Sequence, residues 1–71
     1  EISREMAAAI GKLPADYAKV VRMYDLEGRS VAEVAAAVGR SEGAVYMLRS
    51  RAHDRLRELL ASASRFMSTP G

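Results

Sequence analysis

Five arginines lie close together in the second half of the chain: Arg40, Arg49, Arg51, Arg55 and Arg57. Two acidic side chains oppose them, so residues 40–57 carry a net charge of +3. Residues 1–39 hold five basic and six acidic groups, which gives −1, and residues 58–71 are neutral. Guanidinium groups bind phosphates, and a basic excess confined to one segment is typical of a polyanion-binding surface. A solvated basic helix face is the alternative that charge alone leaves open.

No set of side chains suited to catalysis or metal binding accompanies these arginines. The chain has no cysteine, which excludes disulfides and thiolate zinc sites. His53 has Asp54 beside it, but adjacent residues do not face each other on a helix, and no nucleophile or acid pair is nearby in sequence. We therefore expect no enzyme, no catalytic residues, no metal and no cofactor, and we expect His53 to contact solvent or phosphate.

The length of the chain limits the architecture. Seventy-one residues make one domain, near the lower size at which a protein folds without disulfides or metal. The first residue is glutamate, which suggests a piece of a longer protein. The absence of cysteine fits a bacterial-type cytoplasm. No apolar run is long enough to cross a membrane, and no signal-peptide pattern opens the chain.

Apolar spacing predicts two helices before residue 30. Ile2, Met6 and Ile10 recur at helical spacing, so a first helix is expected near residues 3–12. Pro14 ends it and suits the first turn of a second helix. The apolar face of that second helix holds Tyr17, Val20, Val21 and Tyr24. Gly28 follows as a C-terminal cap with positive φ.

Two more helices are expected after Gly28. Ser30 and Glu33 have the spacing of a capping box, which predicts a helix over residues 31–38. Ser41 can cap a fourth helix that continues to about Leu60. The composition of residues 63–71 predicts a frayed tail, so the domain itself is placed at residues 1–62. No stretch alternates as a strand does, so the predicted fold class is all-α with four helices.

The break between the third and fourth helices has the features of a helix-turn-helix over residues 31–50. Such a turn needs a small residue where the backbones touch, and Ala35 is there. It needs a residue free to take positive φ, and Gly39 is there. It also needs apolar anchors returning from the second helix, and Val45 and Leu48 can face Val34 and Val38. A plain hairpin of helices in a structural bundle is the alternative, but it tolerates many other spacings.

In a helix-turn-helix, the N-terminal part of the second helix lies in the DNA major groove. At 100° per residue, Gly43, Tyr46, Met47 and Ser50 lie opposite the apolar stripe and are candidates to meet base edges. Tyr46 can hydrogen-bond or lie against a thymine methyl, Met47 can make only apolar contacts, and Gly43 allows close backbone approach. Scattered surface apolars, or a protein-binding patch, are the alternatives for Tyr46 and Met47.

The flanking residues of this face are interpreted more simply. Arg40, Arg49 and Arg51 suit phosphates, which position a helix without reading sequence. Glu42 fits the first turn through the helix dipole, and its alternative role is to accept from cytosine N4. The predicted DNA-binding residues are therefore Arg40, Ser41, Glu42, Gly43, Tyr46, Met47, Arg49, Ser50 and Arg51.

From Leu13-Pro14 to Leu60 the chain resembles region 4 of bacterial RNA polymerase sigma factors, especially the extracytoplasmic-function type. The resemblance rests on "LP" before the second helix, on "YDLEGRSVAEVAAAVGRSEGAV" through the turn, and on "RAHDRLREL". It implies a winged-helix-like bundle that binds double-stranded promoter DNA at the −35 element and contacts the β-subunit flap of the polymerase core. An anti-sigma factor is a possible further partner of such a domain.

Carried over by position, the family's reading face falls on Glu42, Tyr46, Met47, Ser50 and Arg51. Two departures stand out. Many members have Thr-Val-Lys/Arg-Ser-Arg-Leu where this chain has Ala-Val-Tyr-Met-Leu-Arg over residues 44–49, and His53 replaces a frequent arginine. The promoter preference of better-known members therefore does not transfer, and base contacts are expected to be fewer and more apolar.

Three alternatives differ in partner. A LuxR-type regulator domain also has four helices, but its recognition helix ends soon after the position of Leu48. A protein-interaction domain that holds an anti-sigma partner would use Tyr46 and Met47 as anchors and have no affinity for DNA. A membrane-surface helix over residues 42–60 is disfavoured, because anionic lipid would repel Glu42, Asp54 and Glu58.

Overall fold

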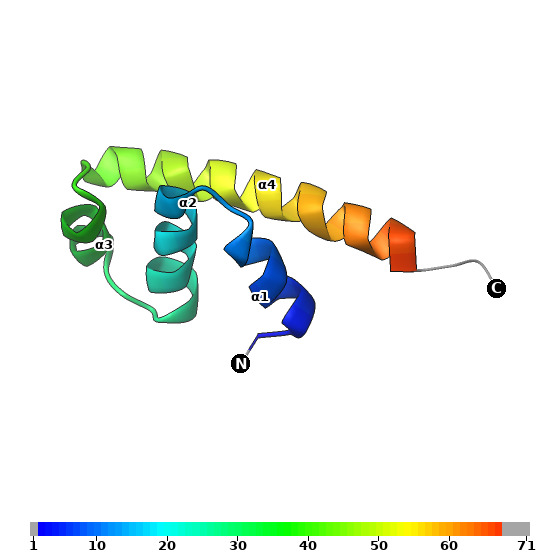
Figure 1. The fold of residues 1–71 in the computed structure, drawn as a ribbon. Helices are drawn as coiled ribbons and strands as arrows, with labels where there is room; N and C mark the ends of the chain where they lie inside the picture. Colours follow the sequence, from blue (N-terminus) through cyan, green and yellow to red (C-terminus); the bar gives the residue numbers. More distant parts are fainter. Residues whose placement is uncertain (1, 68–71) are drawn as a thin grey trace.

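The computed structural model describes residues 2–67, and within them the chain is helical between short turns (Figure 1). The elements are α1 (Arg4–Gly11), α2 (Ala15–Val20), the π-helix η1 (Val21–Leu26), α3 (Val31–Val38) and α4 (Glu42–Met67). Because η1 continues α2 without a break, residues 2–67 form four helical rods. The described residues contain no strand, and the predicted all-α, four-helix architecture is confirmed. Helix α4 runs along one side of the molecule, and the other helices lie against it (Figure 1).

The first two helices begin at residues that fit their capping positions. The Ser3 side chain accepts a hydrogen bond of 3.1 Å from the Met6 N–H, so α1 begins one residue after the predicted start. Pro14 has φ −52° and ψ 151° and directly precedes α2, where its missing N–H leaves no donor unsatisfied. Both observations agree with the sequence prediction to within one residue.

The capping box of α3 is complete. The Glu33 N–H donates to Ser30 Oγ over 3.1 Å, and the Ser30 N–H donates to Glu33 Oε1 over 3.0 Å. The hydrogen bonds from the Ser30 backbone and hydroxyl lower the pKa of Glu33, since they favour its ionised form. The two positive-φ glycines were both predicted: Gly28 has φ 69° and Gly39 has φ 68°. Gly39 thus ends α3 in the left-handed geometry that the turn requires.

The second half of the second helical rod is wound more widely than an α-helix. Over η1 the hydrogen bonds span five residues, as in the 2.9 Å bond from the Glu27 N–H to the Arg22 carbonyl. In an α-helix at 100° per residue, Asp25 would lie about 140° around the axis from the buried Val20. The wider winding reduces that rotation and directs Asp25 towards α4, against which it makes its contacts. The sequence interpretation did not anticipate a π-helix.

Two groups of buried side chains stabilise the fold. The α1 cluster consists of Ala9, Ile10, Leu13, Ala18, Val21, Ala52 and Leu56. The α3 cluster consists of Val20, Val34, Ala35 and Val45, with Val38 and Leu48 packed partly buried against it. The α3 cluster contains the residues predicted to join the two helices of the helix-turn-helix. The expected packing across Gly39 is therefore confirmed.

The fourth helix is longer than predicted. It extends to Met67 instead of ending near Leu60, so residues 63–67, for which the sequence predicts a frayed tail, belong to the helix. Residues 61–67 include two alanines and neither proline nor glycine, the two residues with the lowest helix propensity. The helix can therefore continue through them. The rest of the predicted tail, residues 68–71, lies outside the described residues. No helix in the described part of the chain is long and apolar enough to span a bilayer.

Candidate nucleic-acid interface

The N-terminal turn of α4 presents backbone and small side chains to solvent. Ser41 caps the helix, since its hydroxyl accepts a hydrogen bond of 3.1 Å from the Ala44 N–H. Glu42 is exposed in the first turn, where the helix dipole favours a carboxylate. A Cβ added at Gly43 would meet no atom within 4 Å apart from its own chain neighbours and the nearby backbone of α4, so this part of the helix surface is open. A flat surface such as a base-pair edge can approach the backbone there.

Tyr46 and Met47 form an apolar area one turn further along α4. Their exposed fractions are 51% and 56%, the largest among the big apolar side chains described. Ser50 is exposed on the same side of the helix. At 100° per residue, Tyr46, Met47 and Ser50 all lie at least about 100° from the buried Val45. The structure therefore places the predicted base-reading residues together on the outer face of α4.

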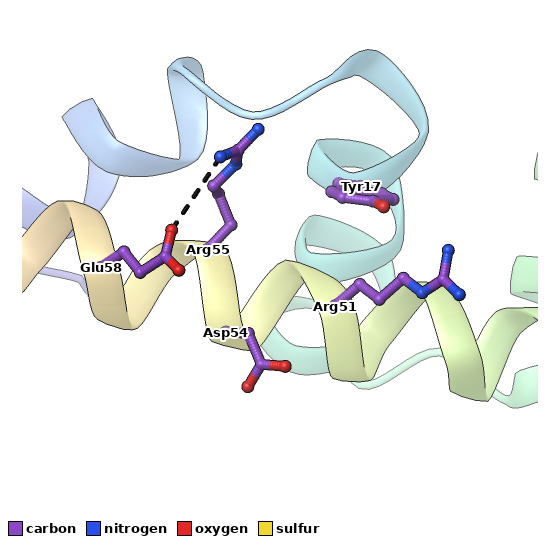
Figure 2. A pocket seen from close by; sticks show the side chains of 5 residues that line it. All are labelled: Tyr17, Arg51, Asp54, Arg55 and Glu58. Atoms are coloured by element: carbon purple, nitrogen blue, oxygen red, sulfur yellow. Dashed lines mark ion pairs between the residues drawn. The ribbon is translucent and has the colours of Figure 1, made fainter.

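Arg51 lies at the edge of this outer face, in a shallow pocket of about 250 Å³ between α2 and α4. Figure 2 shows it near Tyr17 of α2, with Arg55 about one turn and Glu58 about two turns further along α4. Arg55 Nη1 and Glu58 Oε1 are 3.9 Å apart, whereas Arg51 makes no ion pair among the described residues. The Arg51 guanidinium is thus available to an external anion.

Arg40, at the turn before α4, is held by the second helix. Its Nη2 lies 3.2 Å from Asp16 Oδ2, and about half of each side chain is exposed. Exposed pairs of this kind contribute little to stability, at about 0–1 kcal/mol. Asp16 therefore orients Arg40 next to the helix-turn-helix without removing it from solvent, and a phosphate can still compete for it.

Arg49 differs from the other two predicted phosphate contacts, because it turns inward to η1. Its Nε donates to Asp25 Oδ1 over 2.8 Å, and its guanidinium carbon lies 5.0 Å from the centre of the Tyr24 ring. Asp25 is 22% exposed and also receives His53, whose Nε2 is 2.6 Å from Asp25 Oδ2. The expectation that His53 contacts solvent or phosphate is incomplete: 39% of the side chain is exposed to solvent, but its hydrogen-bonding partner is a carboxylate that lies 28 residues earlier in the chain.

The electrostatics of Asp25 follow from these contacts. Burial raises the pKa of Asp25, but the hydrogen bonds and positive charges of His53 and Arg49 together outweigh it and hold the pKa below its ordinary value. Asp25 is therefore an anion at neutral pH, and it balances positive charge on the side of α4 that faces η1.

Tyr46 is also tied to η1. Its ring meets the Tyr24 ring edge to face, with centroids 6.3 Å apart and an interplanar angle of 71°. Such pairs contribute about 0.5–1.5 kcal/mol beyond the area they bury. The neighbouring Tyr24 phenol raises the pKa of Tyr46, and Glu42 adds to the effect. A tyrosine hydroxyl is protonated at neutral pH even without this shift, so that of Tyr46 can both donate and accept a hydrogen bond.

The predicted site residues fall into two groups. Six of them lie together on the exposed outer face: Glu42, Gly43, Tyr46, Met47, Ser50 and Arg51. Ser41 caps the helix, while Arg40 and Arg49 are engaged by acidic residues of the second helical rod. Sequence reasoning missed Asp16, Tyr24 and Asp25. Their only sequence signal is the placement of acidic and aromatic residues on the helix preceding the turn, which does not identify their partners.

Comparison with known proteins agrees with the geometry. The family model described as "Sigma-70, region 4" matches residues 3–60, which is most of the chain. Searches of curated proteins and of solved structures found no match to this chain. The matched range includes α1, the helix-turn-helix and α4 as far as Leu60, and so covers both clusters of buried side chains.

Proposed function

The chain belongs to the sigma-70 region 4 family, and from this premise we propose that it is the −35-binding domain of an extracytoplasmic-function sigma factor that works in the cytoplasm. Region 4 of sigma factors is a DNA-binding domain of transcription initiation and not an enzyme. The assignment to the extracytoplasmic-function type is supported by the residues quoted above, from "LP" at residues 13–14 to "RAHDRLREL" at residues 51–59.

The observation that carries the DNA-binding proposal is the outer face of α4. Tyr46 and Met47 are about half exposed near the N-terminus of α4, which follows the turn at Gly39. Arg51 lies one helical turn after Met47 on the same side of α4. Tyr46 offers a hydroxyl and a ring to base edges, Met47 offers an apolar contact to thymine methyls, and Arg51 offers a guanidinium to a phosphate. Gly43 adds an open stretch of helix surface.

One helix in one groove makes few contacts, so binding by this domain alone should be weak. If about four phosphates are neutralised, affinity falls as roughly the −3.6 power of salt concentration. Tethering to polymerase or to a second DNA-binding region raises the effective concentration and recovers affinity without new contacts. Weak binding in isolation is thus compatible with function inside a holoenzyme.

A salt titration on promoter DNA and on mixed-sequence DNA tests the proposed roles. Arg51→Ala should weaken binding to both DNAs and reduce the salt slope by about 0.9, the value for one phosphate. Tyr46→Ala and Met47→Ala should leave the slope unchanged and cost about 1–3 kcal/mol on the promoter alone. Arg4→Ala, an exposed arginine on α1, is the matched control and should change neither.

The outcomes separate the competing functions. If Tyr46→Ala and Met47→Ala discriminate promoters as well as the parent does, these residues do not read bases. If the parent chain binds no DNA at low salt, the proposal fails, and the exposed pair is better explained as the anchor of a protein partner such as an anti-sigma factor.

We also propose that the polymerase β-flap contacts the half of the domain formed by α1, α2, η1 and α3. An apolar groove of about 450 Å³ supports the contact with α1 and η1, whose residues line it; the remaining lining residues are Ile2, just before α1, and residues of α4, and none come from α2 or α3. Ile2 and Leu26 at its edge are 39% and 44% exposed, and Ile10 and Leu56 line its floor. Cross-linking from Leu26 should capture the flap, whereas cross-linking confined to Tyr46 or Met47 would contradict the assignment.

A further inference from the structure

Tyr24 and Asp25 are adjacent residues of η1 that together contact three side chains of α4. Asp25 accepts from Arg49 Nε over 2.8 Å and lies 2.6 Å from His53 Nε2. The Tyr24 ring packs edge to face against Tyr46 and lies 5.0 Å below the Arg49 guanidinium. The π-winding of η1 turns Asp25 onto the side facing α4, where Tyr24 would lie in an ordinary helix as well, about 40° around the axis from the buried Val20. The four contacts form one connected set that reaches the exposed face at Tyr46.

This set constrains Arg49 more than a single surface ion pair would. At 100° per residue, Arg49 lies only about 40° around α4 from the buried Val45, while Arg51 lies about 120° away on the other side. An isolated exposed pair contributes little, but a cation that is both hydrogen-bonded to a carboxylate and stacked on a ring loses two contacts if it turns away. Because His53 also holds Asp25, the carboxylate is itself fixed in place.

From this arrangement we infer that Tyr24 and Asp25 are positioning residues of the DNA-binding surface. Tyr24 fixes the ring of Tyr46 at the edge of the outer face, and Asp25 holds Arg49 away from DNA phosphates. The inference rests on the proposed DNA-binding function, and it revises the expectation that Arg49 binds phosphate. Phosphate neutralisation by this part of α4 is then confined to the side of Arg51, and the side facing η1 contributes apolar and hydroxyl contacts from Tyr46.

Salt titrations of the 71-residue chain on mixed-sequence DNA test the role of Asp25. Arg51→Ala should reduce the salt slope by about 0.9, whereas Arg49→Ala should leave it unchanged. Asp25→Asn should increase the slope by up to about 0.9, because the released Arg49 can now neutralise a phosphate. Replacing Asp25 removes the partner of His53 as well as that of Arg49. Asp25→Asn is therefore repeated on a His53→Gln background, so that a change in slope is not due to the imidazole. Asp25→Asn on an Arg49→Ala background separates the release of Arg49 from the loss of one negative charge, because only the release requires Arg49.

The role of Tyr24 is tested by binding preference between promoter and mixed-sequence DNA. Tyr24→Leu removes the ring and should reduce the preference as far as Tyr46→Ala does, without changing the salt slope. Tyr24→Phe keeps the ring and should retain the preference of the parent. Equal preference in the parent and in Tyr24→Leu would show that Tyr24 does not position Tyr46.

The results that overturn the role of Asp25 are equally definite. They are a loss of slope in Arg49→Ala as large as that in Arg51→Ala, or an unchanged slope in Asp25→Asn. If Asp25→Asn does not fold, the comparison of Arg49→Ala with Arg51→Ala decides alone, because Arg49→Ala leaves the contact between Asp25 and His53 in place. Absence of DNA binding by the parent is a different result, and it overturns the proposed function itself.

Discussion

Replacing Gly39 tests the turn on which the whole interface depends. Gly39 has φ 68° and ψ 36°, a left-handed conformation that costs an ordinary residue about 1–2 kcal/mol. An added Cβ would meet nothing within 4 Å, so steric collision with the rest of the domain contributes nothing to the cost. Replacing glycine also lowers the conformational entropy of the unfolded chain. For alanine this effect offsets about 0.4–1 kcal/mol of the cost. Valine is worse than alanine because its β-branch disfavours positive φ further.

Gly39→Val should therefore lower the free energy of unfolding by about 1–2 kcal/mol. For a domain of this size that shifts the melting temperature down by about 4–8 °C per kcal/mol. Thermal melting followed by circular dichroism measures it. Gly39→Asn is the matched control and should lose much less, because asparagine tolerates this conformation. An unchanged melting temperature in Gly39→Val, or an equal loss in both variants, would refute the assignment of the cost to backbone conformation.

Two further predictions concern Gly43 and acid stability. Gly43→Ala should raise stability by about 0.5–1 kcal/mol, because Gly43 is helical with open space around it, yet should weaken DNA binding if the backbone approaches DNA there. Stabilisation with unaltered DNA affinity would show that Gly43 is not in the interface. The pKa of Asp25 is lower folded than unfolded, so its contribution to stability is present above its ordinary value of 3.8 and is lost as pH falls through the folded value. Acid titration of the unfolding free energy should show this loss in the parent and a smaller loss in Asp25→Asn, while equal acid sensitivity would contradict it.

The features predicted correctly from the sequence are those encoded within a few residues. The capping box of Ser30 and Glu33, the positive φ of Gly28 and Gly39, and the cap at Ser41 all depend on local hydrogen bonds and backbone sterics. Helix positions followed from apolar spacing, and the packing of Val45 against α3 followed from the short turn. Local rules therefore sufficed for the helix-turn-helix.

The features that were missed depend on how helices pack. Asp25 meets Arg49 and His53 at separations of 24 and 28 residues, and Arg40 meets Asp16 across 24 residues. Those pairs form because the second helical rod packs against α4 and the turn before it, and the spacing of residues within one helix does not predict that packing. The π-winding was missed for a related reason: wide and ordinary turns bury nearly the same residues, so apolar periodicity does not distinguish them.

The division of the buried side chains into two clusters has a consequence for local unfolding. Val20 belongs to the α3 cluster and its neighbour Val21 to the α1 cluster. Among the residues whose burial the structure describes, the second helical rod and α4 are therefore the only elements with buried side chains in both clusters. The buried residues of α1 belong to the α1 cluster, whereas the α3 cluster holds the two helices of the helix-turn-helix together. Segments that share few buried contacts open with different free energies. Amide hydrogen exchange in α1 should consequently proceed through openings that leave the amides of α3 protected, so the two ends of the domain can fluctuate separately while α4 stays helical.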